Sequence, residues 1–199
     1  MSKLHILLLA AGASSRMGSP KPLLEWGGKT LIQYQFDTLR KLGQPVTIVL
    51  GAHADRIVEQ TAIDAPVLLN RDWQNGIGSS IALGVQSLLT NFPGIDGFMI
   101  TLLDQPLLEV QDFRNLIDSF QPGKGMIVVS RSKEGTWSVP VLFDACYLDE
   151  LRSLKGDKGA MGIIRSHYEK VRLVDCSNLE DMDDTEDYKK LSAEFNRRS

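Results

Sequence analysis

Residues 7–24 read LLLAAGASSRMGSPKPLL and pass from an aliphatic run into a loop that carries two glycines and two cations. The aliphatic run predicts a buried β-strand. Gly12 and Gly18 let the backbone turn tightly, so that N–H groups point together at an anion. Arg16 would hold phosphate oxygens through its planar fork and Lys21 as a compact charge. The residues alone leave two interpretations, a polyphosphate-binding loop and a solvated surface loop whose cations keep the protein soluble.

Two common phosphate-binding fingerprints do not fit this sequence. Gly12 and Gly18 are separated by five residues and followed by Ser-Pro-Lys, which departs from the GxxxxGK[ST] spacing. The GGKT stretch at 27–30 has leucine where that motif needs its first glycine, and GIGSSI at 76–81 lacks the last glycine of GxGxxG. Any anion site in this loop is therefore of another type.

Short apolar runs rich in β-forming residues alternate with helical patterns along the chain. The runs cover residues 4–9, 46–50, 67–69, 97–103, 126–130, 139–143 and 171–174. Apolar residues recur at helical spacing in residues 30–42, 81–89 and 110–120. This alternation predicts an α/β fold in which helices cover a mostly parallel sheet. No repeat or long polar linker interrupts the pattern, so we expect one domain over residues 1–199.

Composition limits the classes of partner. The chain has 22 Lys and Arg against 25 Asp and Glu, and its net charge of -3 gives no overall attraction for nucleic acid or an anionic membrane surface. No apolar stretch approaches transmembrane length and no cleavage site follows the first apolar run, so we expect a soluble, cytoplasmic protein. The two cysteines and three histidines are scattered, which argues against a zinc site or a disulfide framework.

A carboxylate follows the apolar run at residues 97–103. Asp104 stands at the carboxyl end of this expected strand, where open α/β sheets bind ligands. Mg²⁺ commonly takes one or two protein carboxylates, and substrate phosphates and water complete its coordination. Asp104 is therefore a candidate metal ligand and catalytic residue. Its alternative role is the N-cap of the next helix, which is disfavoured because Gln105, Pro106 and two leucines precede the helical pattern.

The stretch LAAGASSRMGSPKPLL at residues 9–24 resembles the signature LAAGxSxRMGxxKxLL of the MobA-like NTP transferase family, nucleotidyltransferases that activate molybdopterin, and particularly their cytidylyltransferase branch. Further similarities follow in order along nearly the whole chain. They are NRDWQNGIGSSIALG (70–84), LLDQPLL (102–108), PVLF (140–143), LKGDKGAMGII (154–164) and DMDDTEDY (181–188). The resemblance implies a three-layer α/β/α fold of the nucleotide-diphospho-sugar transferase type.

The resemblance also implies three groups of site residues. Residues along the nucleotide and its phosphates would be Ala10, Ala11, Gly12, Arg16 and Lys21, the last two with a catalytic role. Residues near the base and ribose would be Asn70, Gly76, Ser79 and Ser80. Acceptor contacts would come from Gly156, Asp157, Lys158, Gly159 and Ala160. For the second and third groups, turns and helix starts are the alternative roles.

The second metal ligand is implied by the resemblance of DMDDTEDY to the family's DIDTPEDY. This similarity aligns Asp183 with the second metal-binding carboxylate. Asp184 stands where the family usually has threonine, so the choice between Asp183 and Asp184 is left open. The alternative role of the acidic cluster is a helix start, which suits Glu186 and Asp187 because a helix dipole favours acidic residues near its N-terminus. Leu103, Ser138 and Met161 replace residues usual in the family, and these changes affect the expected acceptor more than the expected nucleotide.

The implied activity is a Mg²⁺-dependent nucleotidyl transfer in molybdenum cofactor biosynthesis. CMP would move from CTP to the phosphate of molybdopterin with release of pyrophosphate, and a molybdoenzyme or its chaperone is the implied protein partner. LAAG in place of the guanylyl branch's LAGG favours CTP. The alternatives are guanylyl transfer from GTP, transfer to another phosphorylated acceptor, and a non-catalytic nucleotide-binding regulator or chaperone of the cofactor.

Overall fold

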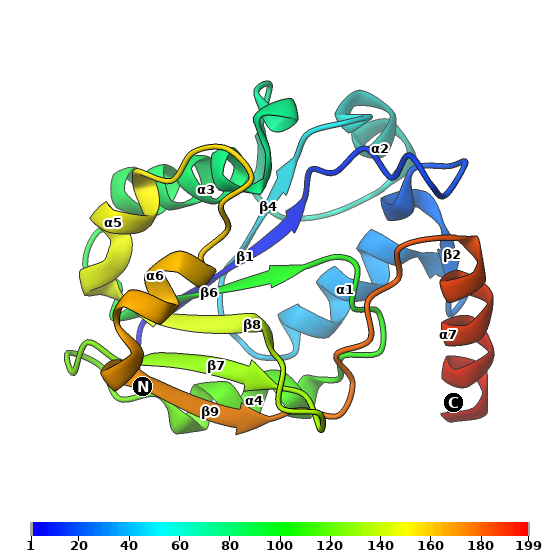
Figure 1. Ribbon diagram of the computed structural model, residues 1–199. Coiled ribbons are helices and arrows are strands. Elements are labelled where there is room, and N and C mark those ends of the chain that lie inside the picture. Colours follow the sequence, from blue (N-terminus) through cyan, green and yellow to red (C-terminus); the bar gives the residue numbers. More distant parts are fainter. Residues whose placement is uncertain (1, 199) are drawn as a thin grey trace.

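The computed structural model describes residues 2–198 and is built around a seven-stranded sheet (Figure 1). The strands, in the spatial order β5-β4-β1-β6-β8-β7-β9, are β1 (Leu4–Ala10), β4 (Val46–Leu50), β5 (Val67–Leu69), β6 (Gly97–Leu102), β7 (Ile127–Arg131), β8 (Trp137–Asp144) and β9 (Val171–Asp175). β8 is antiparallel to β6 and β7, and the other neighbouring pairs are parallel. The predicted mostly parallel sheet is confirmed, and each predicted run supplies one strand.

Helices connect the strands. The α-helices are α1 (Leu31–Arg40), α2 (Ala54–Gln60), α3 (Ile77–Asn91), α4 (Val110–Ser119), α5 (Leu148–Arg152), α6 (Met161–Ser166) and α7 (Thr185–Arg198). Single 3-10 turns lie at Lys21–Leu23, Trp73–Asn75, Ala145–Tyr147 and Tyr168–Lys170, and a small hairpin pairs β2 (Glu25–Trp26) with β3 (Lys29–Thr30). α3 begins four residues before the apolar pattern at 81–89, because its first turn consists of Ile, Gly and two serines with little apolar periodicity.

Two hydrophobic clusters join the sheet to the helices on its two faces. One joins the sheet to α1, α2, α4 and α7 through residues such as Leu31, Phe36 and Phe113. The other joins it to α3, α5 and α6 through residues such as Val85 and Leu151. Figure 1 shows α3, α5 and α6 on one face of the sheet and α1 and α4 on the other. This arrangement confirms the three-layer α/β/α fold.

The strand order reverses direction next to β1. Following the chain, β4 and β5 are added on one side of β1, and β6 is added on its other side. In open α/β sheets, ligands bind outside the carboxyl ends of the strands at such a switch point. The segments that leave β1 and β6 there are the glycine loop beginning at Ala11 and the Leu103-Asp104 segment. The topology therefore places the two most informative sequence features beside one another.

The end of β4 lies against the start of the glycine loop. Ala52 donates its N–H to the carbonyl oxygen of Ala11 at 3.0 Å. A Cβ on Gly51 would lie 2.6 Å from this oxygen and 2.6 Å from the Cβ of Trp73, both closer than real Cβ atoms come. Gly51 is therefore required by close packing, and it lets the turn that carries Trp73 rest on the loop after β1.

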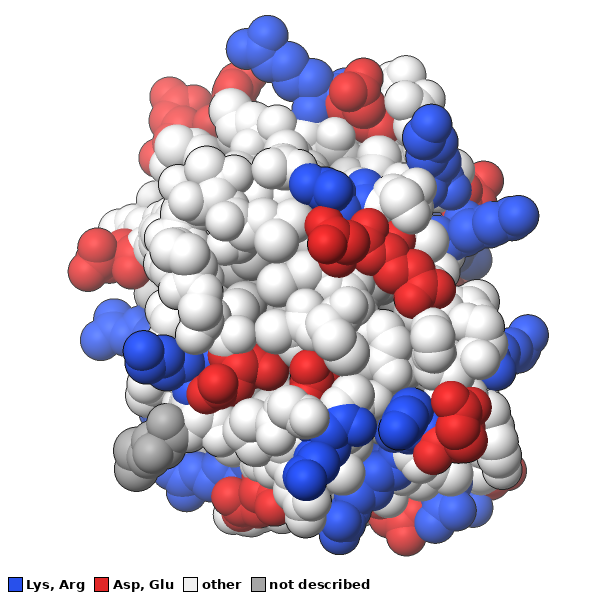
Figure 2. All heavy atoms as spheres, turned by 90° about the vertical axis from the view of Figure 1, so that its left-hand side faces the viewer, with Lys and Arg blue, Asp and Glu red and all other residues white. Residues whose placement is uncertain are grey.

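The outer surface carries charges of both signs. Figure 2 shows the side that lies at the left of Figure 1, where lysines and arginines alternate with acidic residues around a largely uncharged centre. A face with charges of both signs gives no overall attraction for a polyanion. Within residues 2–198, no helix is both long and apolar enough to cross a membrane.

Gly51→Ala tests the close packing at the end of β4. We expect it to lower the free energy of unfolding by about 1–3 kcal/mol, the usual range for forcing extra atoms into a packed site. Urea-induced unfolding measures the change. Gly162→Ala is the matched control, because Gly162 lies in α6 with open space around its missing Cβ. The control should be neutral or gain up to ~1 kcal/mol from better helix propensity, and an equal loss in both variants would contradict the account.

Candidate active site

A cleft of about 440 Å³ opens at the carboxyl ends of β1 and β6. It lies between the glycine loop, the start of α3 and the segment that precedes α7. The site residues from the sequence analysis that line it are Ala10, Ala11, Gly12, Arg16, Lys21, Gly76, Ser80, Asp104, Asp157 and Asp183. Ten residues from five separate segments of the chain are thus gathered around one cleft.

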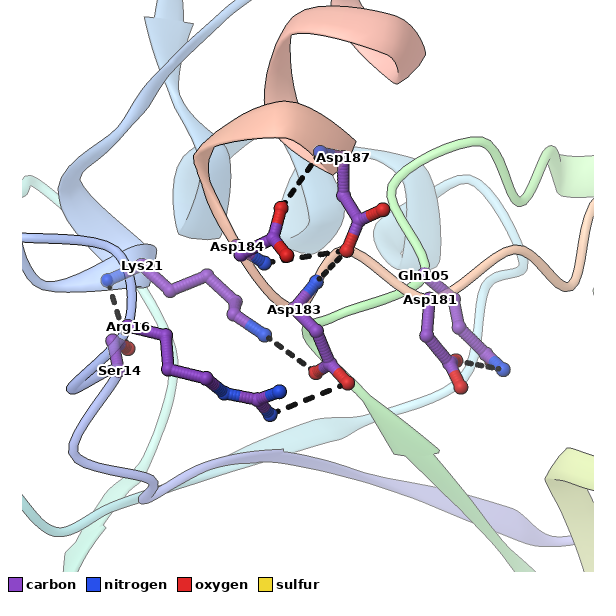
Figure 3. A network of polar contacts seen from close by, with 8 residues as sticks. All are labelled: Ser14, Arg16, Lys21, Gln105, Asp181, Asp183, Asp184 and Asp187. Carbon is purple, nitrogen blue, oxygen red and sulfur yellow. Dashed lines mark hydrogen bonds and ion pairs between the residues drawn. The ribbon is translucent and has the colours of Figure 1, made fainter.

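The glycine loop is held in shape by Ser14. Its backbone is left-handed, with φ of 53°, and its hydroxyl accepts a hydrogen bond of 3.0 Å from the N–H of Lys21. Its carbonyl accepts from the N–H of Met17, whose side chain is buried in the core. These bonds tie Ser14 to the middle and the end of the loop, and Figure 3 shows Arg16 and Lys21 both extending toward Asp183.

A backbone hydrogen bond joins the two acidic segments. The N–H of Met182 donates to the carbonyl oxygen of Asp104 at 2.7 Å, and the side chain of Met182 is fully buried. In extended backbone, alternate side chains point to opposite sides. With Met182 turned into the core, Asp181 and Asp183 are therefore directed away from it, and Asp183 reaches the cleft.

Asp184 is the N-cap residue of α7. Its Oδ1 accepts hydrogen bonds from the N–H groups of Glu186 at 2.8 Å and Asp187 at 3.0 Å, so it caps the start of α7. These bonds lower the pKa of the Asp184 carboxyl. Figure 3 shows the Asp184 side chain turned toward α7 while Asp183 extends toward Lys21 and Arg16. Of the two neighbours, Asp183 is the one that the structure directs into the cleft.

Both loop cations form ion pairs with Asp183. Arg16 Nη2 lies 3.4 Å from Asp183 Oδ2, and Lys21 Nζ lies 3.8 Å from Asp183 Oδ1 (Figure 3). The Lys21 side chain is 13% exposed, whereas that of Arg16 is 68% exposed. Asp183 itself is 49% exposed and both contacts are long, so the two ion pairs are partly screened by solvent and can be exchanged for a better ligand.

Asp104 carries a buried oxygen that lacks a partner. Its Oδ1 is shielded from solvent and forms no hydrogen bond within the described structure. Burial raises the pKa of Asp104 from its ordinary 3.8 to about 6. Lys21 opposes this shift, and the nearby carboxylates of Asp181 and Asp183 add to it. A buried anionic oxygen without a donor is suited to a cation ligand.

Asp181 is a third carboxylate of this group that the sequence analysis did not select. Gln105 is fully buried and its Nε2 donates to Asp181 Oδ1 at 3.0 Å and to Ser138 Oγ at 3.0 Å. Gln105 thus fixes Asp181 close to Asp104, and burial is the main reason why the pKa of Asp181 is raised. The signal in the sequence was the spacing of two between Asp181 and Asp183, which in extended backbone places both on one side.

The residues present fit a divalent metal held mainly by the substrate. Among residues 2–198 there is no group of three or more His, Cys, Asp or Glu side chains arranged to hold a metal. Mg²⁺ needs fewer, because it usually keeps several waters and binds one or two carboxylates together with substrate phosphates. Asp104, with its unpartnered oxygen, and Asp183 are the two carboxylates that would hold such a metal.

The start of α3 closes another side of the cleft. The carbonyl of Gly156 accepts a 3.0 Å hydrogen bond from the N–H of Gly78, and a Cβ on Gly76 would lie 2.2 Å from Asp157 Oδ1. Gly76, just before α3, and Gly78 in its first turn therefore allow the segment between α5 and α6 to lie directly on the helix start. This contact brings Asp157 to the cleft. The other predicted acceptor residues, Gly156, Lys158, Gly159 and Ala160, are absent from the cleft lining.

Asn70 holds the turn before α3 together. Its Nδ2 lies 2.9 Å from the hydroxyls of both Ser79 and Ser80, and its Oδ1 accepts from the N–H of Asp72. Asn70 is 5% exposed, and neither it nor Ser79 lines the cleft. Their predicted contact with base and ribose stays a prediction. Trp73, Gln74 and Ile77 do line the cleft; they lie within the motif at 70–84 but were not among the predicted site residues.

A family model for the MobA-like NTP transferase domain matches residues 6–171. The chain belongs to this family. A curated relative, nicotine blue oxidoreductase of Paenarthrobacter nicotinovorans, is 32% identical over 196 residues, which cover 93% of this chain and 94% of that protein. The probable molybdenum cofactor guanylyltransferase of Rhodopirellula baltica is 30% identical over 130 residues, or 64% of this chain and 61% of that protein.

Solved structures show the same fold. The homologue of Rv0371c from Mycobacterium sp. strain JC1 has a TM-score of 0.83 and 26% identity, with 99% of this chain and 98% of that one covered. Rv0371c of Mycobacterium tuberculosis in complex with manganese has a TM-score of 0.78 and 28% identity, with 96% and 99% covered. A nucleotidyl transferase from Methanothermobacter, 20% identical, has a TM-score of 0.82 over 98% and 99% of the two chains. Family and fold together support nucleotidyltransferase activity for this MobA-like protein.

Asp104→Asn tests the buried charge. The raised pKa means that the folded protein binds more protons than the unfolded chain between pH 3.8 and about 6, so stability falls as pH rises through this window. In EDTA at pH 8, we expect the variant to be more stable by up to about 3 kcal/mol. The gain should shrink as pH falls below about 6. Thermal unfolding across pH measures it, with Asp64→Asn, an exposed site, as the charge-matched control. A gain independent of pH would refute a buried anion at Asp104.

Proposed function

We propose that this protein transfers CMP from CTP to the phosphate group of molybdopterin and releases pyrophosphate, with Mg²⁺ as the metal. The observation that carries the proposal is the gathering of Arg16, Lys21, Asp104 and Asp183 around one cleft at the switch point of the sheet. Two cations beside two carboxylates suit a metal-bound triphosphate, in which negative oxygens need cations and the metal needs carboxylates.

The reaction requires little from the protein besides positioning and charge neutralisation. An oxygen of the acceptor phosphate attacks the α-phosphorus of CTP, and the bond from this phosphorus to the oxygen that bridges to the β-phosphorus breaks. The acceptor phosphate is already ionised, so no general base is needed. Preorganised charge in a partly enclosed cleft then provides most of the acceleration.

The position of each residue in the cleft suggests its role in the reaction. Lys21, which is largely enclosed, would neutralise charge that develops on the α-phosphate, and Arg16 at the more open side would hold the leaving pyrophosphate. Asp104 and Asp183 would hold the metal, which when bound supplies charge neutralisation for the phosphates. Ser14 keeps the two cations in place through its bonds to Lys21 and Met17.

The choice of CTP rests on the side of the cleft formed by the start of α3 and the loop after β1. Gly76, Ser80 and the Ala10-Ala11 backbone lie there, and LAAG resembles the cytidylyl branch. GTP is the competing donor, because one relative is named a guanylyltransferase. A second relative, which covers 93% of this chain, is named an oxidoreductase. For this reason nucleotide binding is tested separately from nucleotidyl transfer.

A comparison of nucleotides tests the proposal directly. With Mg²⁺ present, we expect CTP to raise the melting temperature more than equal concentrations of GTP, ATP or UTP, because a ligand that binds the folded state stabilises it by mass action. Release of pyrophosphate with CTP and molybdopterin should depend on both substrates. Stronger stabilisation by GTP would assign guanylyl transfer. Weak and equal shifts with all four nucleotides would contradict nucleotidyl transfer altogether.

Lys21→Ala tests the enclosed cation. We expect turnover to fall by roughly a hundredfold or more, the range found when a preorganised charge that acts on the transition state is removed. The folded structure should persist, because the hydrogen bond from the backbone N–H of residue 21 to Ser14 Oγ is kept in the variant. Steady-state pyrophosphate release measures the change. Lys124→Ala, at an exposed turn far along the chain, serves as the control. Near-normal turnover in the Lys21 variant would exclude the assigned role.

A further inference from the structure

The cations that the triphosphate needs are already engaged by a carboxylate. Asp183 lies 3.4 Å from Arg16 and 3.8 Å from Lys21, and its side chain is 49% exposed. Within residues 2–198, the ion pairs of these two cations are both with Asp183. A nucleotide phosphate that binds Arg16 and Lys21 therefore competes with this carboxylate for the two cations.

The backbone of Asp183 is fixed, so the carboxylate stays near the cations after it is replaced. The N–H of Asp183 donates to Asp187 Oδ2 at 2.9 Å, and the preceding Met182 is bonded to Asp104 and buried in the core. Figure 3 shows this segment held between α7 and the end of β6. The Asp183 carboxylate can therefore move only by rotation about its side-chain bonds. Its negative charge remains beside any bound triphosphate.

A metal-free triphosphate and a metal-bound one meet this charge differently. The metal-free form brings negative charge alone, so it takes the cations from Asp183 and is then repelled by the carboxylate left behind. The metal-bound form brings a cation for which Asp183 is a ligand, so that Asp183 exchanges its ion pairs for the metal while Arg16 and Lys21 turn to the phosphates. The same carboxylate opposes the first form and favours the second.

We propose that Asp183 is a specificity-determining residue that selects the metal-bound form of the nucleoside triphosphate over the metal-free form, through its exchange between the cations and the metal. The inference rests on the proposed function, because it takes the cleft to be the triphosphate site. It follows that metal and nucleotide bind with positive coupling, each raising the affinity for the other by the same factor. Asp183 is a source of this coupling.

The neighbouring carboxylates do not share this role. Asp181 is held by Gln105 Nε2, and the buried Oδ1 of Asp104 has no partner to exchange. Asp184 caps α7 through two backbone N–H groups. Asp184→Asn therefore removes the same formal charge from the adjacent position and keeps a side-chain oxygen for the cap. It provides a matched control for Asp183→Asn.

The test is the affinity for CTP measured by titration calorimetry, in EDTA and in excess Mg²⁺. In EDTA, we expect Asp183→Asn to bind CTP roughly tenfold more tightly than the unmodified protein, because two partly exposed ion pairs and a repulsive charge are removed. The gain in affinity on adding Mg²⁺ should fall in the same variant. Asp184→Asn should match the unmodified protein under both conditions. In a Lys21→Met background, adding Asp183→Asn should give a smaller gain in EDTA, measured against the Lys21→Met single variant, because, of the two cations, Arg16 alone is then freed by the change.

The outcomes separate this inference from the proposed function. If the unmodified protein binds CTP with Mg²⁺ but Asp183→Asn shows no gain in EDTA, the selection by Asp183 is wrong and the proposed site stands. An equal gain in Asp184→Asn would also overturn it, by showing an effect of net charge alone. If no nucleoside triphosphate binds under either condition, the proposed function is wrong, and the inference that rests on it is wrong as well. Asp183→Ser, which leaves no amide to pair with Arg16, must show the same gain as Asp183→Asn.

Discussion

One backbone hydrogen bond, from the N–H of Met182 to the carbonyl oxygen of Asp104, brings together the two halves of the site. It joins the end of a central strand to a segment almost eighty residues further along, which connects β9 to α7. The buried side chain of Met182 anchors the same point. Because Met182 points into the core, the aspartates on either side of it are directed outward, and Asp183 meets the cations of the glycine loop.

The carboxylates of the site are close to one another and partly buried, and nearby cations and donors compensate for only some of their charge. Burial of Asp104 disfavours its ionised form, and the neighbouring Asp181 and Asp183 add to this effect. Lys21 offsets some of it, and Gln105 donates a hydrogen bond to Asp181. A site built in this way is less stable alone than with a cation bound, and strained charge of this kind is typical of functional sites. The carboxylates are therefore better explained by what they bind than by what they contribute to folding.

The sequence predicted the sheet well and the site in part. The strands were found because central strands of a parallel sheet are apolar on both faces, as in β1, where every residue is buried. Helices α2 and α5 were not predicted, and the starts of α6 and α7 appeared only as alternative roles of residues 156–160 and of Glu186 and Asp187. These helices are short or largely polar and bury few residues. Asp183 and Asp184 could not be separated from the sequence, because the distinction depends on the cap of α7. Likewise the position of Asp181 depends on Gln105, which reaches it across the fold.

The central claim is that Asp104 and Asp183 together hold a metal beside a nucleotide whose phosphates lie on Arg16 and Lys21. A crystal structure with Mn²⁺ and a non-hydrolysable CTP analogue tests it most directly, because the anomalous signal of manganese locates the metal independently of the refined side chains. The account predicts a manganese peak in contact with both carboxylates, with Asp183 released from Arg16 and Lys21 and the triphosphate in its place. A nucleotide-bound structure in which Asp183 remains paired with the two cations, or in which manganese touches neither carboxylate, would contradict it.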